Sequence, residues 1–152
     1  PTRRSSDLNS ISALRSTRNG KLFIGTDQGL FCYDYNTDSC TLYNRQNTNG
    51  IFPETPVKSL LEDSHGHLWI GTWNQGLFRY DLAKNRFYAY PRMLPKSAHV
   101  IFEDSKKRIW IGTWGSGLYV LENAYDPDNV RWKSFSHENG NAKSLPHDII
   151  YR

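Results

Sequence analysis

A long motif recurs three times along this chain, and it restricts the possible folds more than any other feature. The three copies read KLFIGTDQGLFCYD (21–34), HLWIGTWNQGLFRYD (67–81) and RIWIGTWGSGLYVLE (108–122). Their central glycines are spaced by 46 and then 41 residues. Each copy follows a second similar block and precedes a short aromatic one, so each unit has four short elements in the same order. Periods of about 40–50 residues with four strands per unit are typical of propeller blades.

The pattern within each unit predicts short strands. The segment before each glycine is continuously apolar, as in LWI and IWI, which predicts a strand buried on both faces. The segment after it alternates, with Leu77 apolar and Arg79 polar. Turn-forming residues such as Asn19-Gly20 separate the segments, and no stretch shows the period of a long amphipathic helix. Aromatic residues, at 14% of the chain, supply large rings for a core.

These observations predict an all-β chain, a β-propeller fragment of about three four-stranded antiparallel blades plus the first strand of a fourth. We expect the blades over residues 9–47, 48–93 and 94–140, with residues 141–152 beginning the next one. Residues 1–8, PTRRSSDL, resemble the in-frame translation of a DNA-sequencing adapter and are therefore excluded from the reasoning. The chain stops within an apolar run, and we interpret it as a piece of a longer protein.

Composition argues against several classes of function. The formal charge of +4 is scattered and gives no strong case for nucleic acid. No run approaches the 18 apolar residues of a membrane helix, so we expect no direct membrane insertion by this chain. Two cysteines exclude a disulfide-dense scaffold and a four-thiolate zinc site.

The repeated motif resembles the two-component regulator propeller repeat, whose core reads approximately D-x-x-G-x-L-W-I-G-T-x-x-x-G-L-x-x-Y-D. The second copy, from Asp63 to Asp81, fits it almost position for position, and the third ends in Leu-Glu instead of Tyr-Asp. The first copy departs most. It places Ser16 at the position of Asp63, replaces Trp with Phe23, and has a loop one residue shorter.

This resemblance implies a periplasmic, ligand-sensing propeller of a hybrid two-component signalling system. It implies a glycan-derived oligosaccharide as the ligand, and a histidine kinase, receiver and DNA-binding output domain that this sequence does not contain. The expected partners are that oligosaccharide, the remaining blades of the parent protein and a second copy in a homodimer, with no nucleic acid. We expect no enzymatic activity and no cofactor, since the sequence contains no G-x-S-x-G, P-loop or Rossmann fingerprint.

One face of the predicted propeller is the candidate ligand face. In an antiparallel meander, the loops between strands two and three open on the same side as the loops between blades, and function tends to lie on loops of a rigid scaffold. A tryptophan there can stack on the apolar face of a pyranose while polar side chains bind its hydroxyl groups. The candidate ligand-binding residues are Asp27, Gln28, Trp73, Asn74, Gln75, Trp114 and Ser116. The two tryptophans occupy equivalent positions, so packing of blade against blade is an alternative explanation for them.

The sequence predicts no catalytic and no metal-binding residues. His65-Gly-His67 lies in a turn beside Asp63, where a solvated turn is a better explanation than a metal site. Glu62-Asp63 and Glu103-Asp104 are adjacent carboxylates at equivalent positions. Because neighbours in a strand point to opposite faces, neither pair forms an acid–base dyad, and their repetition predicts hydrogen bonds at turns or strand ends.

Two alternatives to a sensor stay open at this point. The first is a lyase similar to those that act on streptogramin antibiotics, which would need a histidine and a glutamate facing each other. The sequence does not place His99 and Glu138 together. The second alternative is a protein-interaction scaffold without a small ligand.

Cys32 and Cys40 are predicted to be free thiols. If Tyr33 pairs with Cys40 across a hairpin, Cys32 pairs with Thr41 on the other side of the sheet. The comparison with the second repeat predicts that Cys40 points into an inter-blade core and Cys32 away from it. Their sulfurs would then be separated by the sheet, whereas a disulfide requires their Cβ atoms about 3.5–4.5 Å apart.

Overall fold

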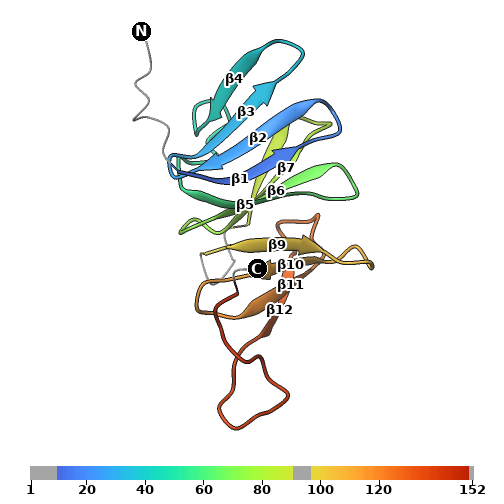
Figure 1. The fold of residues 1–152 in the computed structure, drawn as a ribbon. Coiled ribbons are helices and arrows are strands. Elements are labelled where there is room, and N and C mark those ends of the chain that lie inside the picture. Colours follow the sequence, from blue (N-terminus) through green and yellow to red (C-terminus); the bar gives the residue numbers. More distant parts are fainter. Residues whose placement is uncertain (1–9, 91–96, 151–152) are drawn as a thin grey trace.

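The fold consists of three four-stranded antiparallel sheets, each with its strands in chain order (Figure 1). The structure is a computed structural model that describes residues 10–90 and 97–150. Blade 1 contains β1 (Ile11–Ser16), β2 (Lys21–Thr26), β3 (Leu30–Asp34) and β4 (Ser39–Tyr43). Blade 2 contains β5 (Val57–Glu62), β6 (His67–Thr72), β7 (Leu77–Asp81) and β8 (Arg86–Tyr90). Blade 3 contains β9 (Val100–Glu103), β10 (Ile109–Gly112), β11 (Leu118–Glu122) and β12 (Arg131–Phe135).

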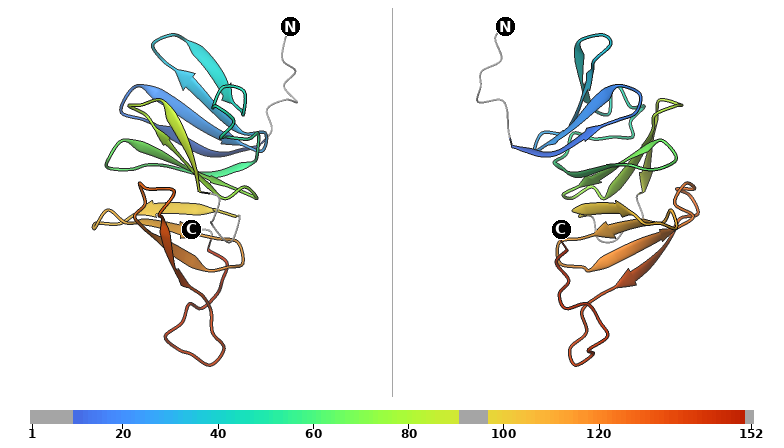
Figure 2. Two further views of the ribbon diagram at one scale, coloured as in Figure 1. Left: turned by 180° about the vertical axis from the view of Figure 1, so that it is seen from behind. Right: turned by 45° about the vertical axis from the view of Figure 1, so that its right-hand side comes forward.

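The predicted all-β class and four-stranded blades are confirmed. The three sheets stack face to face in chain order, and the loop after β12 extends away from blade 3 (Figures 1 and 2). The first strands of successive blades contact one another, β1 with β5 and β5 with β9. An isolated bridge between Trp114 and Ile149 follows blade 3. None of the elements in the described ranges is a helix long and apolar enough to span a membrane. The proposed adapter segment 1–8 lies outside the described residues, as do residues 91–96.

Strand β6 is buried on both faces, as its continuous apolar run predicts. Leu68 and Ile70 belong to the core between blades 1 and 2, while Trp69 belongs to the core between blades 2 and 3. All three side chains have no exposed surface. The outer blades each leave one apolar face uncovered in the described structure, where Leu14 is 57% exposed and Phe102 is 60% exposed.

The glycine of each repeat lies in close contact with the segment that follows its blade. A Cβ added to Gly71 would lie 2.4 Å from the carbonyl oxygen of Ala98, the residue that leads into blade 3. The equivalent contacts are Gly25 against Val57 Cγ1 at 2.7 Å and Gly112 against Ile150 Cγ2 at 2.6 Å. Since no other residue lacks a Cβ, only glycine allows the next blade to sit directly on the second strand.

We therefore expect Gly71→Ala to destabilise the protein by about 1–3 kcal/mol, because the methyl group meets backbone that must move. The control is Gly50→Asn, since Gly50 has a φ of 78° with nothing within 4 Å of an added Cβ, and asparagine tolerates this conformation. Urea unfolding of both variants measures the difference. Equal stabilities would contradict the close approach.

The turn alignment of blade 1 differs from the predicted one. Thr17, not Ser16, occupies the position of Asp63. Thr17 N donates to Lys21 O and Gly20 N donates to Thr17 O, as the corresponding groups do around Asp63. The hydrogen bonds of the turn fix this alignment, in which Ser16 is equivalent to Glu62 of the second repeat.

The β3–β4 register agrees with the predicted one, but the exposure of the two cysteines does not. Tyr33 pairs with Cys40 and Cys32 pairs with Thr41, and both cysteines are free. Cys32, however, is buried in the core between blades 1 and 2, and Cys40 is exposed. The prediction failed because the β4 face carrying Cys40 has no neighbouring blade in the described structure.

Denatured, unreduced protein should show two reactive thiols per chain. In native protein Cys40 should react with a thiol reagent at once and Cys32 much more slowly, because burial raises the pKa of Cys32 and blocks access to it. Titration before and after denaturation, with Cys40→Ser as the control, gives both results. No reactive thiol after denaturation would show that the two sulfurs are bonded.

Candidate functional site

The threonine after each glycine holds the loop that follows it. Thr72 is buried, and its hydroxyl donates to Gly76 O at 2.7 Å while accepting from Gln75 N at 3.1 Å. Thr113 makes the same two bonds to Gly117 O and from Ser116 N. The Gly-Thr pair therefore both seats the next blade and fixes the direction in which the following residue projects.

The residues that follow two of these threonines form an exposed aromatic cluster. Trp73 and Trp114 are 42% and 50% exposed, and their ring centroids lie 6.3 Å apart. His99, which precedes β9, packs against both rings, with centroid distances of 5.9 Å to Trp73 and 5.4 Å to Trp114. Three rings from blades 2 and 3 thus make one continuous surface.

The cluster continues toward blade 1 through charged residues. The ammonium group of Lys58, on β5, lies 5.7 Å from the centroid of the Trp73 ring and 3.2 Å from Asp27 Oδ1. Burial and the charge of Lys58 lower the pKa of His99, so its imidazole is neutral at pH 7. We call Asp27, Lys58, Trp73, His99 and Trp114 the rim row.

The other predicted ligand residues lie in the same loops. Gln28, Asn74 and Gln75 are exposed and Ser116 is half-buried. Asn74 Oδ1 accepts a hydrogen bond from Thr55 at 3.0 Å, which joins the loop between blades 1 and 2 to the β6–β7 loop. These loops open on one side, which we call the loop face.

The predicted ligand-binding residues did not include two members of the rim row, Lys58 and His99, and His99 was considered only for the lyase alternative. Both are the second residue of a repeated block, VKSLLED and AHVIFED, directly after an aliphatic residue. This alignment was the available signal. It did not show that each of these two residues lies against the preceding blade, beside the residue that follows the repeat threonine of that blade.

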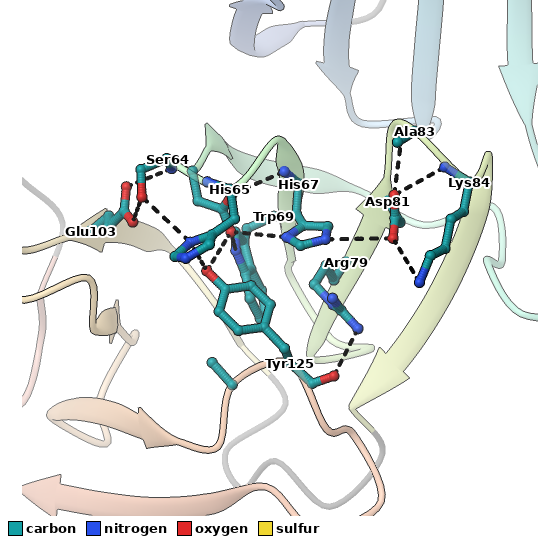
Figure 3. A network of polar contacts seen from close by, with 12 residues as sticks. Ser64, His65, His67, Trp69, Arg79, Asp81, Ala83, Lys84, Glu103 and Tyr125 are labelled. Carbon is teal, nitrogen blue, oxygen red and sulfur yellow. Dashed lines mark hydrogen bonds and ion pairs between the residues drawn. The ribbon is translucent and has the colours of Figure 1, made fainter.

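The opposite side of the molecule, the turn face, is organised around Asp63. Figure 3 shows His67, Trp69 and Tyr125, which are among its hydrogen-bond partners. This carboxylate has no exposed surface. It accepts hydrogen bonds from His67 N at 2.9 Å, Trp69 Nε1 at 2.8 Å and Tyr125 OH at 2.9 Å. Although burial opposes ionisation, these donors hold the pKa of Asp63 below its usual value. Asp104 binds Trp110 Nε1 at 2.9 Å in the same way, which explains the spacing of Asp and Trp in the motif.

A loop of blade 3 covers this turn. Tyr125 lies in the β11–β12 loop, and its ring centroid is 5.0 Å from those of both His65 and His67. Arg79 donates to Tyr125 O at 3.2 Å, and its buried guanidinium group lies 4.4 Å from the Tyr88 ring centroid. Within the described part of the chain, no three His, Cys, Asp or Glu side chains are grouped to hold a metal. These contacts join blades 2 and 3.

The adjacent carboxylates form turn hydrogen bonds, as their repetition predicts. Glu103 accepts from Ser64 N at 2.9 Å and from Ser64 Oγ at 2.6 Å. Glu62 accepts from Arg18 N at 3.4 Å at the equivalent place one blade earlier. Each glutamate therefore caps the first turn of the preceding blade, which is a structural role.

We expect Asp63→Asn to lower the free energy of unfolding at pH 7 by about 1–3 kcal/mol, because an amide NH₂ would face buried donors. The folded-state pKa of Asp63 is lowered, so its stabilisation is complete above about pH 4 and is lost as the pH falls through the folded value.

Urea unfolding at pH 7 and pH 3 measures this effect. Wild-type protein should lose more stability between the two values than Asp63→Asn, and Asp38→Asn, an exposed control, should behave as wild type. Equal losses in wild type and Asp63→Asn would contradict the account.

The fold and its two faces define this chain as part of a β-propeller domain. The family model described as the two component regulator propeller matches residues 51–74 and 93–115. Each match ends in the loop after the second strand, so it covers the Gly-Thr pair. Two segments of the chain, in blades 2 and 3, therefore match the two-component regulator propeller repeat. The unmatched first repeat is the one that departs most from the motif.

Solved structures share the blade architecture at low sequence identity. An extracellular domain from B. thetaiotaomicron, described as that of a hybrid two component system, is 19% identical over 99% of this chain, with a TM-score of 0.60. A second such domain is 22% identical over 90% of the chain, with a TM-score of 0.65. The chain spans 25% and 20% of these two domains. Virginiamycin B lyase from Staphylococcus aureus is 15% identical over 86% of this chain and 43% of its own, with a TM-score of 0.63. No curated protein matches the sequence significantly.

Proposed function

We propose that this chain is part of the periplasmic sensor region of a hybrid two-component system, outside the inner membrane. We also propose that its loop face binds a glycan-derived oligosaccharide. The family repeats support the sensor assignment. The two B. thetaiotaomicron domains with the same fold are extracellular, which supports the location.

The exposed tryptophan pair is the observation on which the ligand assignment rests. Trp69, which packs between blades, has no exposed surface, whereas Trp73 and Trp114 are about half exposed. A tryptophan that serves only to join blades would stabilise the fold most if it were fully buried, as Trp69 is. Rigid, exposed rings beside polar loop residues suit a pyranose, whose C–H face stacks on indole while its hydroxyl groups bind polar side chains.

Trp73→Ala and Trp114→Ala should each weaken oligosaccharide binding by about 1–2 kcal/mol, because each removes a stacking surface. Unfolding free energies should change by about 0.5 kcal/mol or less, as for exposed sites. Calorimetry with gluco-, manno- and xylo-oligosaccharides measures affinity, and urea unfolding measures stability.

Tyr35→Ala is the matched control, since Tyr35 is 55% exposed but lies at the β3–β4 turn on the opposite face. It should leave the affinity unchanged. Large losses of stability with unchanged affinity in both tryptophan variants would instead assign the pair to blade packing.

A lyase is the alternative function with specific support. His99 lies on the loop face, and the S. aureus lyase shares the fold. Within the described residues, however, Glu138 accepts from Asn141 Nδ2 in its own loop at 2.7 Å, and no carboxylate is hydrogen-bonded to His99. Incubation with virginiamycin B tests this alternative. An intact antibiotic by mass spectrometry supports a binding role, and a modified one supports the lyase.

A further inference from the structure

The charges of the rim row carry a further inference about the ligand. Its one cation in the described structure, Lys58, is already engaged by the protein, with Asp27 Oδ1 at 3.2 Å and the face of Trp73 at 5.7 Å. The row holds one carboxylate and one ammonium group, and His99 is neutral at pH 7. The row therefore has no net charge.

An anionic sugar would bind poorly to this arrangement. A uronate carboxylate that approached Lys58 would have to displace Asp27 or bind beside it, and two carboxylates at close range repel each other. It would also lose part of the hydration of its own charge against the apolar rings. Nothing in the row offsets these costs.

A neutral sugar meets complementary groups along the same row. The Asp27 side chain is 44% exposed, and an ionised carboxylate has about four acceptor positions, of which Lys58 occupies a part. Its remaining positions can accept hydrogen bonds from sugar hydroxyl groups. Trp73, His99 and Trp114 provide apolar ring surface further along.

We propose that the rim row selects neutral over anionic oligosaccharides and that Asp27 determines this specificity by neutralising Lys58. This inference rests on the proposed oligosaccharide function. It adds the chemical class of the sugar and identifies the residue that sets it.

The test compares sugars that differ only at C6. Calorimetry on the protein measures cellotetraose and β-1,4-mannotetraose against their C6-carboxylate counterparts, in wild type and in Asp27→Asn. Wild type should prefer a neutral sugar. Asp27→Asn should bind the carboxylated counterpart about two- to fivefold more tightly than wild type does, because Lys58 loses an exposed ion-pair partner. High salt should reduce this gain.

Asp38→Asn is the control for net charge, since it removes one exposed carboxylate from a turn on the opposite face. It should leave both affinities unchanged. Carboxylated sugars that bind wild type as tightly as the neutral ones would overturn the inference about Asp27 but leave the proposed function intact. Failure of every neutral and carboxylated sugar to bind would overturn both.

Discussion

The close approach at each repeat glycine is the contact on which the rest of the structure depends. Because Gly71 has no Cβ, the backbone of Ala98 lies directly on the second strand of the preceding blade. The neighbouring threonine then fixes the loop that leaves this contact. One dipeptide therefore sets both the stacking of the blades and the direction of the residue after it, which is why scaffold and candidate site repeat with the same period.

The two faces built on this contact differ in how deeply their central side chains are buried. On the turn face, Asp63 is fully buried and accepts from Trp69 and Tyr125, which joins blade 2 to blade 3. On the loop face, Trp73 and Trp114 remain about half exposed. A structure that buries its central carboxylate on one side and leaves anchored aromatic rings open on the other is suited to binding a ligand on the open side.

Repetition explains how much of this could be predicted from the sequence. Three copies of the motif gave the strands, the all-β class and the β3–β4 register, because local hydrogen bonding and alternation determine them. The opposite faces of Cys32 and Cys40 were predicted correctly, but which of them is buried was predicted wrongly, since exposure depends on which blade lies alongside. Lys58 and His99 were not assigned to the ligand face because they contact Asp27 and Trp73 of the preceding blade, and a contact between blades has no fixed spacing in the chain.

A crystal structure of the protein with a bound neutral oligosaccharide would show whether the rim row is the binding site. We expect a pyranose ring stacked on Trp73 or Trp114, with a sugar hydroxyl group within hydrogen-bond distance of Asp27. A sugar bound on the turn face around Tyr125, or on the outer sheet faces with the rim row unoccupied, would contradict it.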